Sequence, residues 1–455
     1  MATTDYDKPI RKGARDHARA LTRLGLPLVG AQLAQMSIFT VDTLMLGWYD
    51  VTALAAVSLA GPLFFLVFIL GSGFAWAVLP MVSAAVAEGD QTQVRRTTRM
   101  GLWLSLVFAA LVLPVFFVAE PILLAVGQER DVAVLAAHYL AIVSAALPAA
   151  LVIQLLRSFL TALELTRVLV VGTVAWSGLN AILNYALIFG NWGAPELGVT
   201  GAAIASVTGN VFFMTVLILY ARARCPEYEL WKNLHRPDWD ALGQVFRLGW
   251  PISLTLVSEV GLFAASTLLM GALGEIPLAA HGIALQIASI TFMVHLGLSQ
   301  AITVRAGRAW AQTDKEALRG AASVALAMSL TFAVMTILTF LIVPEFLVGL
   351  FIDPTDPDRD AVLAVGVTLL ALAALFQLVD AAQVMALGTL RGVQDTFWPM
   401  IMATISYWLI GLPAAWILGL YLGYGGAGVW LGLTVGLASA GIMMQWRFWT
   451  RFARG

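Results

Sequence analysis

The chain has 455 residues, of which 60% are hydrophobic and 12% are charged, and its net charge is −1. A soluble domain contains about 25% charged residues, so this composition excludes an ordinary soluble protein and indicates one that lies in lipid. Cys225 is the only cysteine, which excludes an intrachain disulfide. The balanced charge gives no reason to expect a nucleic-acid partner.

Twelve stretches reach the roughly 20 apolar residues that a helix needs to cross the hydrocarbon. The first six are Leu24–Trp48, Leu59–Ala84, Gly101–Val118, Val132–Leu156, Val168–Phe189 and Gly201–Tyr220. The second six are Leu248–Leu273, Ile283–Val304, Ala321–Val343, Ala361–Leu387, Phe397–Leu418 and Gly428–Trp446. The sequence therefore predicts an all-α integral membrane protein with 12 transmembrane helices. Prolines inside these spans are tolerated and can kink them; they include Pro27, Pro80, Pro148 and Pro251.

The basic residues support this number of spans. With twelve crossings, all of the 26 lysines and arginines except Arg130 and Arg359 fall in the tails or in every second loop. Arg157 and Arg167, for example, are assigned to the loop after the fourth span. Because basic loops stay in the cytoplasm, both termini are predicted to be cytoplasmic.

The two halves of the chain are related in sequence. Arg23-Leu24-Gly25-Leu26-Pro27 recurs without a gap as Arg247-Leu248-Gly249-Trp250-Pro251, and the match continues through a polar loop. Six spans separate the copies, so the halves are expected to form two lobes with the same orientation, a parallel repeat. The predicted parts are a cytoplasmic tail (1–23), a six-helix lobe (24–221), a cytoplasmic loop (222–247), a second six-helix lobe (248–446) and a tail (447–455).

Three carboxylates lie inside the predicted spans: Asp42, Glu259 and Asp380. A charge in the membrane is costly, so each is a functional candidate. No lysine or arginine is expected at their depth. A desolvated carboxyl group favours its neutral form and can act as a proton carrier, whereas the ionised form attracts Na⁺ or an organic cation. The alternative is a protonated acid that only hydrogen-bonds a neighbouring helix.

Amide side chains accompany the carboxylates. Such groups line a polar face, but they are also common contacts between helices in lipid. They are Gln35 on the face of Asp42, Gln377 and Gln383 on that of Asp380, and Asn180 with Asn184 on the fifth span. In the repeat, Asp42 aligns with Ser266 and Glu259 with Gln35, so the acids are not copied. Two unlike sites in similar lobes are therefore expected.

Other chemistry is not indicated by the sequence. It contains no GxxxxGK[ST] loop for a nucleotide, no paired His or Cys spacing for a structural metal and no GxSxG motif. An enzyme is therefore disfavoured, and no cofactor is expected. His281 and His295 lie in the eighth span, where they could relay protons or serve as hydrogen-bonded packing residues.

The chain as a whole resembles the multidrug and toxic compound extrusion (MATE) family, in particular its bacterial NorM-like branch. Each motif is weak alone, and together they are specific. They are Pro27, Gln32–Gln35 and Val41-Asp42-Thr43; Leu179-Asn180, Asn184-Tyr185, Gly190 and Gly193-Ala194-Pro195; Glu259; and Gln377, Asp380-Ala381-Ala382-Gln383 and Leu390-Arg391-Gly392.

This resemblance implies a secondary antiporter of the bacterial cytoplasmic (inner) membrane that exports cationic or amphipathic drugs in exchange for H⁺ or Na⁺. It implies that Glu259 and Asp380 bind the coupling cation, including Na⁺. It also implies that Asp42, Asn180 and Asn184 bind substrate or protons, with Gln35 and Gln377 as companions. We expect a monomer in membrane lipid. Phe376 departs from the family, because some relatives have tyrosine there.

Two other transporter classes share this architecture. A lipid-linked oligosaccharide flippase would have two similar lobes, but it typically needs a basic cavity for phosphates. A major facilitator also has parallel six-helix halves. The loop from Glu88 to Arg99, however, does not resemble that family's signature, because it lacks the GxxxDRxGR pattern. Both alternatives are therefore less favoured than a drug exporter.

Overall fold

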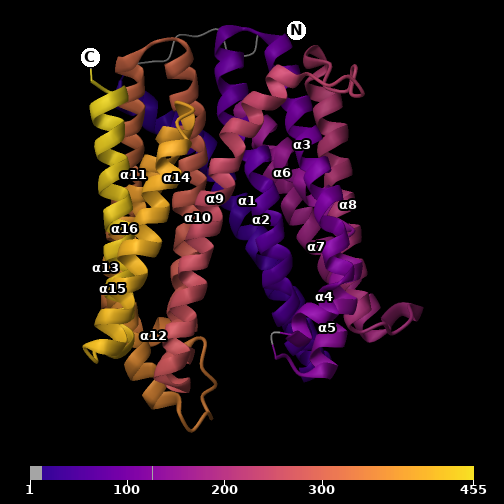
Figure 1. Ribbon diagram of the computed structural model, residues 1–455, viewed down its shortest axis with the longest axis vertical. Coiled ribbons are helices and arrows are strands. Elements are labelled where there is room, and N and C mark those ends of the chain that lie inside the picture. Colours follow the sequence, from indigo (N-terminus) through magenta and orange to yellow (C-terminus); the bar gives the residue numbers. More distant parts are fainter. Residues whose placement is uncertain (1–12, 126, 455) are drawn as a thin grey trace. The chain divides into compact units, whose positions relative to one another are not determined.

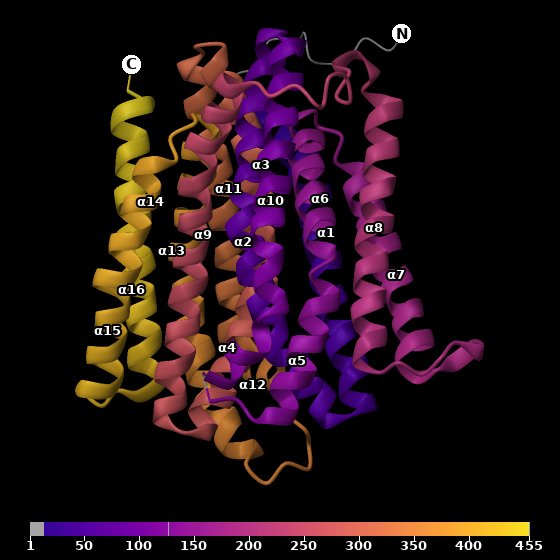
Figure 2. The ribbon, with the colours of Figure 1, turned by 45° about the vertical axis from the view of Figure 1, so that its right-hand side comes forward.

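The computed structural model describes residues 13–125 and 127–454, in which every regular element is helical. The helices of the first half are α1 (Ala14–Tyr49), α2 (Val51–Glu88), α3 (Gln91–Phe117), α4 (Ala119–Ala125), α5 (Arg130–Val143), α6 (Ala146–Ala162), α7 (Arg167–Phe189) and α8 (Val199–Arg224). Those of the second half are α9 (Trp239–Leu273), α10 (Glu275–Ala311), α11 (Lys315–Ile342), α12 (Pro344–Gly349), α13 (Arg359–Gly392), α14 (Phe397–Thr404), α15 (Leu412–Trp416) and α16 (Gly425–Arg447). Neighbouring helices pack along their length, as α13 and α16 do in Figure 1 and α7 and α8 in Figure 2.

Eleven spans in the described part of the chain are long and apolar enough to cross a membrane, and α5 with α6 make a twelfth if this bent pair is one span. The start of α1 and the end of the chain both lie beside the first turns of α11. The His17 ring packs against Gly320, and Arg319 donates a hydrogen bond to the Ala453 carbonyl. A chain that begins and ends on one side crosses an even number of times, which favours twelve. The predicted all-helical membrane fold is confirmed.

The fourth predicted span is bent by 51° between α5 and α6. Pro148 has no backbone N–H to donate to the Ser144 carbonyl, one turn earlier. That carbonyl accepts from the Leu147 amide instead, at 2.9 Å. The shorter loop of bonds tightens the turn at the junction, so Pro148 accounts for the bend.

Two segments predicted to be polar tail or loop are partly helical. α1 begins at Ala14 rather than Leu24, and α9 begins at Trp239 rather than Leu248. Hydropathy marks only the part of a helix that lies in lipid, whereas backbone hydrogen bonding continues into the aqueous region. Lys8, Arg11 and Lys12 of the predicted tail lie outside the described residues.

The chain forms two compact units. One is Gly30–Ser253, and the other combines Leu254–Gly455 with Met1–Val29. The boundaries fall inside α1, after Val29, and inside α9, after Ser253, which are aligned positions of the repeat. The first helix of each half therefore begins in one unit and continues in the other.

Backbones approach closely at aligned positions in the two units. A Cβ on Gly73 of α2 would lie 2.2 Å from Ser253 Oγ and 2.5 Å from the Gly249 carbonyl oxygen. In the other unit, a Cβ on Gly297 of α10 would lie 2.5 Å from Val29 Cγ2 and 2.8 Å from its nitrogen. Gly73 aligns with Gly297 and Ser253 with Val29, so both halves use a glycine to admit a neighbouring helix.

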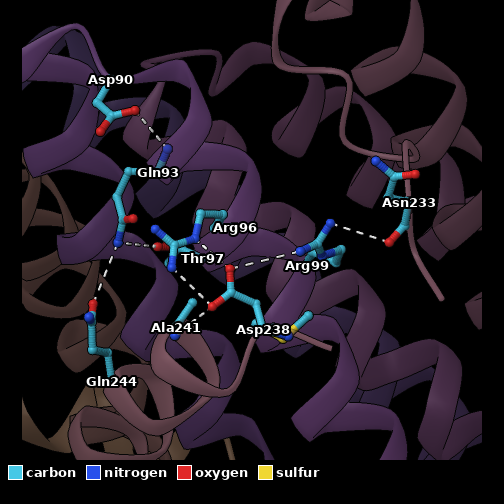
Figure 3. Close-up of polar contacts among 10 residues, drawn as sticks. Asp90, Gln93, Arg96, Thr97, Arg99, Asn233, Asp238, Ala241 and Gln244 are labelled. Carbon is cyan, nitrogen blue, oxygen red and sulfur yellow. Dashed lines mark hydrogen bonds and ion pairs between the residues drawn. The ribbon is translucent and has the colours of Figure 1, made fainter. Parts of the chain in front are cut away.

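The segment between α8 and α9 is held against α3 (Figure 3). Arg96 on α3 donates from Nε to Asp238 Oδ2 at 2.5 Å and from Nη2 to Oδ1 at 3.0 Å. Asp238 Oδ1 also accepts from the Ala241 amide at 3.1 Å, so the same carboxylate caps α9. The Arg96 hydrogen bonds hold the pKa of Asp238 below its usual value. Trp103 fixes this segment further by donating to the Leu234 carbonyl at 2.7 Å.

The contact at Gly73 gives a test of the packing. We predict that Gly73→Ala lowers the thermal stability of the detergent-purified protein, because the new methyl group meets backbone atoms that a side-chain rotation cannot clear. Overpacking of this kind costs about 1–3 kcal/mol. Gly61→Ala on the same helix is the matched control, since no atom lies within 4 Å of its Cβ position. Equal melting temperatures for the two variants, measured by loss of the monodisperse chromatographic peak, would contradict this packing.

Candidate functional site

Asp42 lies in a polar cluster of the Gly30–Ser253 unit. The Asn184 amide nitrogen donates to Asp42 Oδ1 at 2.5 Å and to Asn180 Oδ1 at 3.2 Å. Asp42 is 9% exposed, and both asparagines are fully buried. Asn180 and Asn184 are one turn apart on α7, so that helix presents both amides to the carboxylate on α1. The three residues that the family resemblance grouped are thus in contact.

Two further residues complete this cluster and were missed from the sequence. Ser206 on α8 donates to Asp42 Oδ2 at 3.4 Å. Tyr139 on α5 is buried, hydrogen-bonds Ser206 and interacts electrostatically with Asp42. Ser206 has Asn210 one turn later on α8, but neutral polar side chains in a span are also common contacts between helices. The sequence alone therefore did not mark either residue as part of a site. Four helices therefore contribute to the surroundings of Asp42.

Gln35 hydrogen-bonds a basic residue, which its position on the Asp42 face of α1 did not suggest. Arg157 donates from Nη1 to Gln35 Oε1. Arg157 lies within α6 and is 8% exposed, so its predicted place in a cytoplasmic loop is wrong. The bent α5–α6 pair ends later than the predicted fourth span, and this extension carries Arg157 into the helix.

Glu259 and Asp380 lie in the other unit, on α9 and α13. Asp380 is 2% exposed, Glu259 is half-buried, and the two carboxylates interact electrostatically. Tyr407 is fully buried and interacts with both. Its hydroxyl accepts a hydrogen bond from Gln383 Nε2 at 3.0 Å. The structure therefore brings together the two carboxylates that the sequence placed in separate spans.

Arg391 corrects the expectation that no base lies near the carboxylates. It is 6% exposed near the end of α13 and interacts electrostatically with Glu259. The predicted tenth span ended at Leu387, whereas α13 continues to Gly392. A basic residue at the end of an apolar stretch looks like a loop residue in the sequence, but helix packing buries this one.

Tyr407 belongs to an irregular helix. The predicted eleventh span, Phe397–Leu418, is a continuous helical segment in which Ile405–Gly411 and Ile417–Tyr421 have π-helical hydrogen bonding. Such widened turns occur frequently at functional sites. A π turn shifts the register of the side chains that follow, so a regular helical period could not predict that Tyr407 faces the carboxylates.

The position that aligns with Asp42 has different chemistry. Ser266 lies 3.5 Å from His281 Nε2, and Trp430 donates to His281 Nδ1 at 3.1 Å. An indole N–H can only donate, so His281 holds its proton on Nε2 in this arrangement. All three side chains are fully buried. This neutral, hydrogen-bonded group supports a packing role for His281.

Oxygen acceptors remain free on the face of α13. Asp380 Oδ2, Gln377 Oε1 and Gln383 Oε1 are buried and accept no hydrogen bond from any described residue. Hard cations such as Na⁺ take carboxylate and amide oxygens, so these residues fit a cation. Among the described residues, no group of three or more His, Cys, Asp or Glu side chains could hold a metal ion. Any cation here would depend on two carboxylates and neutral oxygens.

Both halves of the chain match one known family. The MatE family model matches in two segments, residues 27–186 and 251–417. The chain belongs to the MatE family. The two matched segments begin at Pro27 and Pro251, the aligned prolines of the internal repeat, and together they cover most of both halves.

Curated relatives support this membership over nearly the full length. The chain is 48% identical to the probable multidrug resistance protein NorM of Rhizobium meliloti (strain 1021) over 441 residues, which are 96% of this chain and 94% of the relative. It is 45% identical to the protein of the same name from Agrobacterium fabrum (strain C58 / ATCC 33970) over 434 residues, 95% and 93% of the two chains.

Solved structures of MATE proteins share the fold. A crystal structure of MATE in complex with MaL6 matches with a TM-score of 0.87 at 19% identity, covering 94% of this chain and 95% of that one. The eukaryotic MATE transporter AtDTX14 matches with a TM-score of 0.83 at 19% identity, covering 97% of each chain. This MatE chain is therefore a multi-pass membrane transporter and not an enzyme, and the major-facilitator alternative is wrong.

Proposed function

We propose that this MatE chain is a secondary active multidrug exporter of the bacterial cytoplasmic membrane. It exchanges cationic or amphipathic compounds for H⁺ or Na⁺ by alternating access of its two lobes. The observation that carries the proposal is the pair of unlike carboxylate clusters, Asp42 in one unit and Glu259 with Asp380 in the other. Relatives named as probable multidrug resistance proteins support the drug as cargo.

The coupling cation is assigned to Glu259 and Asp380. Two neighbouring carboxylates repel each other when both are ionised, so a proton or Na⁺ between them is strongly favoured. Asp380 Oδ2 is buried without a hydrogen-bond donor from the described residues, which leaves it available to a cation. Arg391 already interacts with Glu259, so an entering cation competes with this guanidinium. Gln377 and Gln383 offer neutral oxygens on the same helix face.

Substrate or proton binding is assigned to Asp42 with Asn180 and Asn184. Asn184 and Ser206 both donate to Asp42, an arrangement that favours the ionised carboxylate and hence a bound organic cation. Asn184 Oδ1 is buried and accepts no bond within the described chain. If Asp42 takes up a proton, a rotated Asn184 amide can accept a hydrogen bond from the protonated carboxyl group through Oδ1. The cluster can therefore satisfy both charge states of the carboxyl group.

A lipid-linked oligosaccharide flippase remains the alternative function. The sequence argument against it, that no basic residue lies within the membrane, does not hold, because Arg157 and Arg391 are buried. However, Arg157 is bonded to Gln35 and Arg391 interacts with Glu259, so neither is a free site for phosphate. The choice of drug export over the flippase rests on the relatives.

The positive-inside pattern of the loops supports cytoplasmic termini. We also propose that the protein acts as a monomer in lipid.

The first prediction concerns coupling. Glu259→Gln or Asp380→Asn should abolish uphill efflux of a fluorescent cation from proteoliposomes, while inserted protein is present at the wild-type level. The amide keeps the shape of the carboxylate but removes the charge that binds the driving cation. Asp360→Asn is the matched control, because this aspartate on α13 has a side chain that is 98% exposed. Undiminished uphill transport by either test variant would remove that residue from the coupling site.

A second prediction separates the two clusters. Asp42→Asn mimics the protonated carboxyl group permanently, so binding of a fluorescent cation should weaken and lose its pH dependence. Any effect of Na⁺ on this binding that arises at Glu259 and Asp380 should remain in the variant. The measurement is equilibrium binding to purified protein across a pH series, with and without Na⁺.

Asp131→Asn serves as the control for that series, because Asp131 is exposed on α5 of the same unit. A wild-type pH profile for Asp42→Asn would show that another group responds to protons. Loss of a Na⁺ effect in Asp42→Asn would contradict the assignment of separate roles to the two clusters.

A further inference from the structure

One face of α10 donates hydrogen bonds to backbone carbonyls of α13. Ser299 Oγ donates to the Val384 carbonyl at 3.0 Å, and Thr303 Oγ1 donates to the Gly388 carbonyl at 2.8 Å. His295 is one turn before Ser299 on the same face. These bonds tie the two helices together over successive turns.

His295 extends this series to the turn that carries Asp380. Its Nδ1 lies 2.7 Å from Ser329 Oγ on α11, and Ser329 Oγ donates to the Ala381 carbonyl at 3.4 Å. Ala381 directly follows Asp380. His295 and Ser329 are both fully buried, so the chain of bonds is shielded from water. It joins α10, α11 and α13 at the residue that follows Asp380.

Gln377 holds the other side of the same turn. Its Nε2 donates to the Ala288 carbonyl on α10 at 3.3 Å, and its side chain lies beside the His295 ring. Gln377 is one turn before Asp380 on the same face of α13. Asp380 is thus bracketed by two contacts, that of Gln377 with α10 before it and that of Ala381 with Ser329 on α11 after it. The His295 ring lies beside Gln377 and contacts Ser329.

The proton arrangement gives the chain a direction. A serine hydroxyl has one proton and a carbonyl can only accept. When Ser329 donates to Ala381, Nδ1 of His295 must carry the proton that is donated to Ser329. In this arrangement, Nδ1 is the atom of His295 that acts on Ala381 through Ser329, and a neutral ring is sufficient for this role.

We propose that His295 is a positioning residue of the cation-coupling site, which through Ser329 fixes the turn of α13 that presents Asp380 to the cation. This inference rests on the proposed function, because it assumes that Asp380 binds the driving cation. Fixing Asp380 in advance reduces the ordering that cation binding would otherwise require. Loss of the fixation should weaken cation binding rather than stop transport.

The bonds of Ser299 and Thr303 supply the contrasting case. They join the same two helices, but they end at Val384 and Gly388, farther along α13 from Asp380. If His295 served only to hold helices together, its loss and that of the Thr303 hydroxyl would have the same consequences. Val384 directly follows Gln383 of the cation site, whereas Gly388 adjoins none of its residues, so Thr303→Val is the matched control for a purely structural role.

The experiment uses the full-length protein in proteoliposomes and measures efflux of a fluorescent organic cation. The Na⁺ or proton gradient, whichever drives the wild type, is varied to give the half-saturating concentration and the maximal rate. The variants are His295→Asn, His295→Gln, His295→Leu, Ser329→Ala and Thr303→Val. An asparagine amide nitrogen can occupy the place of Nδ1, whereas a glutamine amide reaches that of Nε2.

We expect Ser329→Ala and His295→Leu to raise the half-saturating cation concentration by about five- to tenfold, the loss expected for one buried hydrogen bond. Their maximal rates should stay close to the wild-type rate. His295→Asn should restore the wild-type value, and His295→Gln should not. Thr303→Val should lower thermal stability without changing the half-saturating concentration.

Three outcomes would overturn the inference. They are an unchanged half-saturating concentration in Ser329→Ala, a shift of equal size in Thr303→Val, and rescue by glutamine but not by asparagine. Ser329→Ala removes only one oxygen, so it provides a result even if His295→Leu does not fold. Failure of the proposed function is distinguishable, because neither gradient would then drive efflux by the wild-type protein.

Discussion

A carboxyl group buried in a membrane protein must obtain from its neighbours the hydrogen bonds and charge that water would supply. This requirement explains why each carboxylate lies where several helices meet. Asp42 has donors on two other helices, Asn184 on α7 and Ser206 on α8. Asp380 lacks this compensation at Oδ2, which is buried and accepts no bond within the described residues. That incomplete compensation is what makes the second cluster suited to a mobile cation.

The repeat provides similar scaffolds for different chemistry. Aligned glycines, Gly73 and Gly297, admit the neighbouring helix in each unit. The helix caps at Asp90 and Asp314 are also alike. In each, Oδ1 of the aspartate accepts a hydrogen bond at 2.9 Å from the backbone amide three residues later. At the position of Asp42, however, the other half has Ser266 with His281. Backbone packing was thus retained while the polar side chains diverged, which fits a transporter that handles two unlike ligands.

The sequence predicted the helical spans, the relation between the two halves and the position of three carboxylates inside spans. Each prediction rests on a signal that the sequence itself contains: apolar length, gapless identity, or a charge within an apolar stretch. It did not predict Arg157, Arg391 or Tyr407. The two arginines lie near the ends of apolar stretches and become buried only through packing between helices. Tyr407 reaches the carboxylates through a π-helical turn, which a regular period does not reveal. Side chains that join a site through tertiary contacts or irregular turns could therefore be assigned to it only from the structure.

In the proposed transport cycle, the two clusters couple an entering cation to a departing one. The most direct test is uptake of a fluorescent cationic dye into everted membrane vesicles, with the pH gradient and the Na⁺ gradient imposed separately. Dye should accumulate against its own gradient when at least one cation gradient is imposed and should stop when that gradient is collapsed. Accumulation that needs neither gradient, or that is driven only by added ATP, would contradict this coupling.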